Sequence, residues 1–124
     1  MNIIISNANN KPIYEQIYIQ IKNCIISGEL TEGDMLPSIR MLAKDLRISV
    51  ITTNRAYDEL EKDGYIYTVA GKGSYVAEKN TELLREDHLK QIEEYMKKIN
   101  ELAPACNLGD EDIIKMMKLI QKGC

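Results

Sequence analysis

The residues that decide the fold are 38–62, SIRMLAKDLRISVITTNRAYDELEK. In the first half, apolar side chains recur every three or four residues, at Ile39, Leu42, Ala43 and Leu46. In the second half the same spacing recurs at Thr53, Ala56, Tyr57 and Leu60. Arg47 and Ile48 interrupt the pattern, and Ser38 and Ser49 stand where a serine can cap a helix N-terminus. The stretch predicts two short helices on either side of a tight turn, each with one face toward a core.

The charges of the second predicted helix are distributed unevenly along its length. Residues 50–55 contain no acidic side chain, whereas Asp58, Glu59, Glu61 and Asp63 crowd the far end. The front of a helix also carries the positive end of the helix dipole and unpaired N–H groups, so this front suits an approach to phosphates. An ordinary solvated helix face would show similar charges, and this helix alone leaves both interpretations open.

Composition limits the classes of protein to consider. The 124 residues suffice for one compact domain with an appendage, and 44% apolar and 28% charged residues are typical of a globular chain. The net charge is −3, so the chain lacks the basic excess that often marks a nucleic-acid-binding protein. Any binding to DNA would depend on a local arrangement of cations: Arg40, Lys44, Arg47, Arg55 and Lys72.

The residues that carry most chemistry are few and scattered. Cys24, Cys106 and Cys124 are odd in number and far apart, without a C-x-x-C pair, so we expect reduced thiols, no metal and no cofactor. A response of Cys106 and Cys124 to oxidation stays open. His88 is the only histidine and no catalytic set or phosphate loop is visible, so we expect no enzyme. No signal peptide or membrane-spanning stretch appears, and we expect a cytoplasmic protein.

Two further elements flank the central stretch. Residues 13–27 carry apolar side chains at helical period behind Pro12 and before Gly28, which predicts a scaffold helix. After Gly64, β-branched and aromatic residues at 65–69 and 74–76 surround Ala70-Gly71-Lys72-Gly73 and predict a β-hairpin. Its tip glycines allow a close approach of the backbone to another molecule, although a plain turn would use the same glycines.

The last part of the chain predicts a helical pair. Residues 81–103 show a long amphipathic pattern that ends before Pro104, and Asp110 is placed to cap a final short helix. Their apolar positions are Leu84, Leu89, Ile92, Met96, Ile99, Ile113, Ile114, Met117 and Ile120. About forty residues cannot hold a core of their own, so this face needs cover from the first domain or from a second copy. The continuous stripe favours a second copy, and we divide the chain into a domain of residues 1–79 and a dimerisation region of residues 80–124.

Taken together, these pieces resemble the winged-helix domain of the GntR family of bacterial transcription regulators over roughly residues 11–78. The resemblance rests on P-I-Y-E-Q-I from Pro12, G-D-x-L-P-S-x-R-x-L-A from Gly33, the helix from Ser49, and G-x-G-x-Y-V from Gly71. The short tail resembles that of the YtrA-like branch, whose members dimerise through a helix pair. The resemblance implies a mainly α, winged helix-turn-helix protein with a small β-hairpin. It implies a homodimeric repressor that binds an inverted-repeat operator in double-stranded DNA.

The resemblance also implies which residues contact DNA. The matching positions are Ser38, Arg40, Val50, Ile51, Thr52, Asn54, Arg55, Gly71, Lys72 and Gly73, and Lys44 and Ser49 complete the predicted set. The sequence departs from the family where Val50 and Asn54 stand, because many members carry arginine at these positions. This departure argues against guanine recognition and favours an adenine contact by Asn54 and a thymine methyl contact by Ile51.

One alternative and one question remain. Residues 1–80 hold nine Lys and Arg against ten Asp and Glu, a net charge of −1, which is compatible with a winged-helix module that binds another protein and no DNA. The sequence names no small-molecule effector. We expect no second domain that could hold one, so an effector would have to act at the dimer interface or between the two halves.

Overall fold

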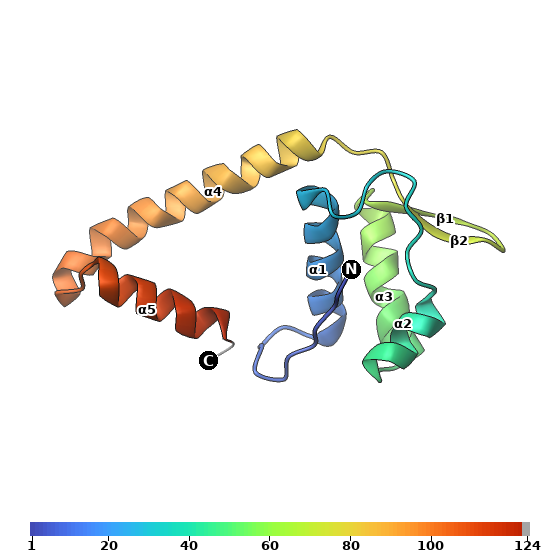
Figure 1. The fold of residues 1–124 in the computed structure, drawn as a ribbon, viewed down its shortest axis with the longest axis horizontal. Helices are drawn as coiled ribbons and strands as arrows, with labels where there is room; N and C mark the ends of the chain where they lie inside the picture. The colour runs from blue at the N-terminus through green and yellow to red at the C-terminus, as the bar shows by residue number, and fades with distance from the viewer. Residues whose placement is uncertain (123–124) are drawn as a thin grey trace. The chain divides into compact units, whose positions relative to one another are not determined.

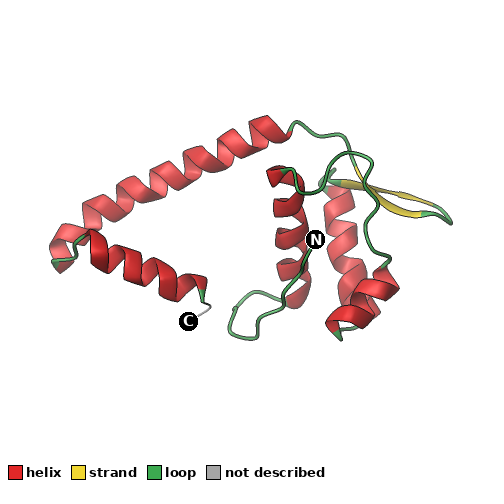
Figure 2. Cartoon of the chain, in the orientation of Figure 1, coloured by secondary structure: helices red, strands yellow, loops and turns green. Residues whose placement is uncertain are grey.

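In the computed structural model, residues 1–122 are described and fall into two compact units. The first unit contains Met1–Ile5 and Asn10–Leu84, and the second contains Ser6–Asn9 and the residues from Arg85 onward. The fold is mainly helical with one two-stranded antiparallel sheet, as Figure 2 shows, and the predicted fold class is confirmed. The sequence places the boundary between the two parts at residues 79 and 80, whereas the compact units divide a few residues later, after Leu84.

Helix α1, Ile13–Ser27, is the scaffold helix of the first unit. It begins after Pro12, whose fixed φ of −55° starts the chain in a helix-compatible direction, and it ends at Gly28, whose φ is 87°. Ile17, Ile21 and Ile25 recur every four residues and are almost completely buried. These three side chains therefore provide one continuous face against which the rest of the domain packs.

Helices α2, Ile39–Leu46, and α3, Val50–Lys62, form the predicted helix-turn-helix. Figure 1 shows α2 packed across one end of α3. The turn between them places Arg47 in the left-handed region at φ 57°, and the Ile48 N–H donates to the Ala43 carbonyl over 3.0 Å. This turn reverses the chain within three residues and brings the front of α3 to the surface.

Strands β1, Ile66–Val69, and β2, Gly73–Val76, pair antiparallel with Ile66 opposite Val76. Residues 34–36 run along the other side of β2, because the N–H of Leu36 donates to the Ser74 carbonyl and the N–H of Val76 donates to the Asp34 carbonyl, both over 2.9 Å. The connection between α1 and α2 therefore supports the hairpin as a short third strand would. This pairing fixes the direction of the wing relative to α3.

The core of the first unit joins all of these elements. Its fully buried side chains are Ile17, Ile21, Ile25, Leu36, Thr53, Leu60 and Val76. Tyr57 is also buried, and its hydroxyl donates to the Pro37 carbonyl over 2.7 Å at the entrance to α2. The core thus holds α3 from behind and leaves its opposite side exposed.

The second unit consists mainly of helix α4, Thr81–Leu102, the 3-10 helix η1, Ala103–Cys106, and helix α5, Asp110–Gln121. The predicted cap of α5 is wrong by one residue, because Gly109 is the cap and Asp110 is the first helical residue. The Gly109 N–H donates to the Asp112 carboxylate over 2.9 Å, so the third residue of the helix satisfies the backbone donor of the cap residue. Among residues 1–122, no helix is both long enough and apolar enough to cross a membrane.

Candidate nucleic-acid interface

Helix α3 is buried on one side and exposed on the other. Thr53, Ala56, Tyr57 and Leu60 are buried, whereas Ile51, Asn54, Arg55 and Asp58 follow the spacing i, i+3, i+4, i+7 on the opposite side and are exposed. Ile51 is the most open of the large apolar side chains, with 82% of its surface accessible. A helix that is buried on one side and exposed on the opposite side has the geometry that a major groove accepts.

The front of α3 is capped as predicted. The Ser49 hydroxyl accepts from the Thr52 N–H over 3.0 Å and donates to the Thr52 hydroxyl over 2.8 Å. Ser38 plays the same role for α2 by accepting from the Met41 N–H over 3.1 Å. The two serines and Thr52 therefore shape the helix entrances, and the acid-free first turn of α3 keeps its positive end unopposed.

Four of the predicted cations lie outside α3. Arg40 and Lys44 lie on α2, Arg47 lies in the turn, Lys72 lies at the tip of the hairpin, and all four are exposed. Within residues 1–122 none of the four takes part in an ion pair. Their charges are therefore available to a polyanion without an internal carboxylate having to be released first.

Two of the predicted contact residues are engaged with other side chains. The Arg55 guanidinium carbon lies 3.8 Å from the centroid of the Tyr14 ring on α1, a close cation–π contact. The Asn54 amide nitrogen donates to the Asp58 carboxylate over 3.3 Å, one helical turn away. Arg55 therefore joins α3 to α1, and the Asn54 donor is directed along its own helix.

The wing tip combines glycine turns with one charge. Gly71 and Gly73 have φ values of 77° and 127°, a region that residues with a Cβ rarely adopt. A Cβ on Gly73 would also lie 3.2 Å from the Met35 methyl group, so this position needs glycine for space as well. Behind the tip, the rings of Tyr67 and Tyr75 stack with centroids 5.7 Å apart. The arrangement holds Lys72 at the exposed end of a stiffened hairpin.

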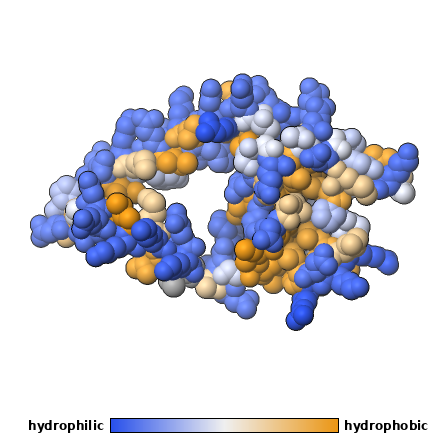
Figure 3. Space-filling view, viewed as in Figure 1, coloured by the Kyte–Doolittle hydropathy of each residue, from blue (hydrophilic) through white to orange (hydrophobic). Residues whose placement is uncertain are grey.

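The tail leaves its predicted contact residues largely uncovered. No residue of α4 or α5 is buried, and Figure 3 shows apolar surface along α4 and near its junction with α5. Exposed members of the predicted set are Leu89, Ile92, Met96, Ile114, Met117 and Ile120, while Ile99 and Ile113 are half-buried. Leu84 packs against the core of the first unit. Five further exposed apolar residues were not predicted: Leu83, Tyr95, Leu102, Met116 and Leu119.

Two residues of the site escaped the sequence analysis. Asp58 follows Asn54 by one helical turn, and this spacing alone predicts their contact. Tyr14 is different, because nothing local in the sequence signals that its ring meets Arg55 across the packed helices α1 and α3. Only the relative placement of two helices determines that contact.

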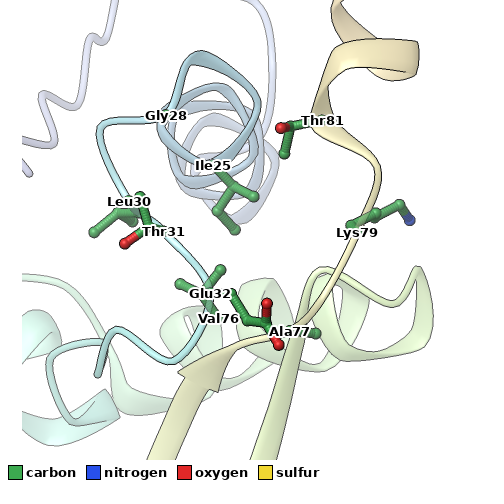
Figure 4. A pocket seen from close by; sticks show the side chains of 9 residues that line it. All are labelled: Ile25, Gly28, Leu30, Thr31, Glu32, Val76, Ala77, Lys79 and Thr81. Atoms are coloured by element: carbon green, nitrogen blue, oxygen red, sulfur yellow. The ribbon is translucent and has the colours of Figure 1, made fainter.

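The first unit also contains a small pocket. A pocket of about 160 Å³ between the end of α1 and the start of α4 has an apolar floor of Ile25, Leu30 and Val76 (Figure 4). Lys79 lines it with its aliphatic chain, but its amine donates to the Asp63 carbonyl over 2.6 Å and lies over the Tyr65 ring. Within residues 1–122, no group of three or more His, Cys, Asp or Glu side chains is placed to hold a metal.

Comparisons with known proteins agree with this geometry. The family described as "Bacterial regulatory proteins, gntR family" matches residues 13–76. The HTH-type transcriptional repressor YtrA of Bacillus subtilis (strain 168) is 38% identical over 97 residues, which cover 78% of this chain and 75% of that protein. A solved GntR family transcriptional regulator from Listeria monocytogenes is 38% identical with a TM-score of 0.66, covering 89% of this chain and 96% of that chain.

A third comparison includes DNA. A solved complex of AraR(DBD) with operator ORE1 is 25% identical with a TM-score of 0.53, covering 62% of this chain and 94% of that chain. The matching family and the named relatives are transcriptional regulators and not enzymes. This chain therefore belongs to the GntR family of bacterial regulatory proteins, and its similarity to YtrA places it with the YtrA-like branch.

Proposed function

We propose that this protein is a sequence-specific DNA-binding transcription repressor that acts in the cytoplasm as a homodimer. The observation that carries the proposal is the front of α3, which is exposed, capped and free of acidic residues in its first turn. Four exposed cations on α2, in the turn and at the wing tip take part in no ion pair within residues 1–122. Such an arrangement attracts phosphates locally although the chain as a whole is acidic.

Similar proteins support the two parts of this proposal. The B. subtilis relative is named a repressor, and AraR(DBD), which shares the fold, is solved on an operator. In helix-turn-helix proteins the front of the second helix enters the major groove, and the exposed side of α3 has the corresponding position. Arg40, Lys44 and Lys72 would then contact the DNA backbone on either side of that groove.

The tail supports the dimer. Its two helices expose apolar side chains along their length and bury none, which is unfavourable for a chain that remains a monomer in water. A two-fold pairing of two tails would cover these side chains and would present two copies of α3. The operator should then be an inverted repeat with half-sites about one helical turn, or a multiple of it, apart.

The alternative is a winged-helix module that binds another protein. Its support is the net charge of −1 for residues 1–80, together with exposed Met35 and Tyr67 on the hairpin side of the domain. This alternative requires no attraction to DNA. It therefore differs from the first proposal in its response to salt.

A fluorescence anisotropy titration with labelled duplexes of random sequence separates the two. We expect binding at low salt that weakens as salt increases, because phosphate contacts release counterions. Arg40→Ala should weaken binding several-fold and lower the salt slope by about two for a dimer, one for each protomer. Lys90→Ala removes the same charge from an exposed position on α4 and serves as the matched control. The absence of binding at any salt concentration would favour the protein-binding module.

A further inference from the structure

The outward face of α3 is apolar at the place where recognition helices usually carry hydrogen-bonding groups. Ile51 stands at the front of this face and is 82% exposed, and the neighbouring Val50 is 48% exposed. Both lie in the first turn of the helix, and the fold leaves most of Ile51 and about half of Val50 exposed. Covering an exposed isoleucine with an apolar group of a partner is favourable in water.

Two polar residues of the same face, Asn54 and Arg55, make contacts within the protein. A bidentate contact with adenine uses both the donor and the acceptor of an asparagine amide. The Asn54 donor is directed to Asp58, and Arg55 lies over the Tyr14 ring on α1. One N–H of the Asn54 amide and one face of the Arg55 guanidinium are thus occupied within the protein, whereas Ile51 stays open.

Asp58 adds an electrostatic preference. Its exposed carboxylate lies on the same face as Ile51, at a spacing of i+7. Guanine presents only acceptors, N7 and O6, to the major groove, so Asp58 would disfavour guanine at a base pair about 10 Å along the helix from the one that Ile51 meets. Thymine presents its C5-methyl group, which an apolar side chain covers favourably.

We infer that Ile51 selects the operator by the 5-methyl group of a pyrimidine in the major groove. This inference rests on the proposed DNA-binding function and specifies the ligand of that site. Thymine supplies the methyl group in ordinary DNA, and 5-methylcytosine supplies the same group in methylated DNA. The specificity at this position follows the methyl group and not the hydrogen-bonding pattern of the base pair.

The expected size of the effect follows from burial of one methyl group. Removing it weakens binding about fourfold per half-site, and about fifteenfold when both half-sites of a dimer's operator are changed. The loss should be nearly independent of salt, because no phosphate contact changes. A salt-independent loss distinguishes the methyl contact from an effect on the backbone contacts.

The test uses duplexes enriched from a random pool by the full-length protein, with each thymine replaced in turn by deoxyuridine. Deoxyuridine keeps every hydrogen-bonding atom of thymine and lacks only the methyl group. We expect one position in each half-site to show the fourfold loss with the parent protein and no loss with Ile51→Ala. Cytosine at that position should bind weakly, and 5-methylcytosine should restore much of the affinity.

Controls keep the outcome unambiguous. Met35→Ala shortens another exposed apolar side chain outside α3 and should retain the full deoxyuridine effect. Because Ile51 is exposed, Ile51→Ala should unfold at the same temperature as the parent. The inference is overturned if every deoxyuridine substitution is neutral, or if Ile51→Ala shows the same loss as the parent. Failure of the proposed function would look different, because no duplex would be enriched at all.

Discussion

At the scale of single residues, Arg55 shows how a residue predicted to contact DNA also serves the fold. Its guanidinium lies 3.8 Å from the centroid of the Tyr14 ring, and so it connects the exposed side of α3 to α1. A stacked guanidinium still presents N–H groups at its edge, because stacking uses only the face of the plane. Arg55 is therefore positioned by Tyr14 before any DNA arrives, and the position of that edge depends on α1.

The contact between Arg55 and Tyr14 can be measured by a double-mutant cycle. Tyr14→Leu and Arg55→Ala should each lower the free energy of unfolding. The loss in the double variant should be about 0.5–1 kcal/mol smaller than the sum of the two single losses, because each single variant already removes the contact. Urea denaturation of the parent protein, the two single variants and the double variant gives this coupling free energy. Strictly additive losses would show that the cation–π contact contributes nothing to stability.

Cys24 provides a residue-scale prediction about reactivity. Burial, together with a hydrogen bond to Glu29, raises the pKa of its thiol to about 11. A raised thiol pKa lowers the thiolate fraction at pH 8 to about one part in a thousand, and only the thiolate reacts readily. In a Cys124→Ser background, iodoacetamide at pH 8 should leave Cys24 unlabelled in the native protein and label it after unfolding in urea. Rapid native labelling of Cys24, detected by mass spectrometry, would contradict this assignment.

At the scale of elements, the sequence predicted the helices and the hairpin because their signals are local. The serine caps, the Pro12 start and the glycine stops depend only on neighbouring residues, and the structure confirms them. The pairing of residues 34–36 with β2 was not predicted, because it joins segments that are far apart in sequence. The same limit applies to the site: the sequence indicated the front of α3 but gave no sign of the partner of Arg55.

The turn between α2 and α3 carries the clearest element-scale prediction. Arg47 is held at φ 57°, a conformation that is unfavourable for a residue with a Cβ. Arg47→Gly should raise the free energy of unfolding by about 0.5–1 kcal/mol by relieving this strain. The same change removes an exposed cation beside α3 and should weaken binding to random-sequence duplexes. Urea denaturation and anisotropy measure the two effects, and a destabilised variant would show that the turn tolerates arginine without strain.

At the scale of the whole molecule, the proposed function requires a second copy of the chain. The tail has no buried residue of its own, so the apolar positions of α4 and α5 are the natural contact surface. Ile92 lies within the long stripe of α4 and is exposed. A substitution at Ile92 should therefore affect the dimer directly if two tails pair through this stripe.

Replacing Ile92 with a charged residue tests the proposed dimer. Ile92→Glu should raise the dissociation constant of the dimer at least a hundredfold, because each dimer would bury two unpaired carboxylates. Lys90→Glu introduces the same carboxylate two residues away, outside the apolar stripe, and should leave the dimer intact. Sedimentation equilibrium measures both variants, and a monomeric parent protein would contradict the proposed role of the tail.

The most direct test of the central claim is to enrich duplexes from a random pool with the purified full-length protein. We predict that the enriched sequences share an inverted repeat, with half-sites separated by about one helical turn or a multiple of it, and that two protomers bind each duplex. A pool without enrichment, or a single asymmetric site that binds one protomer, would contradict the account.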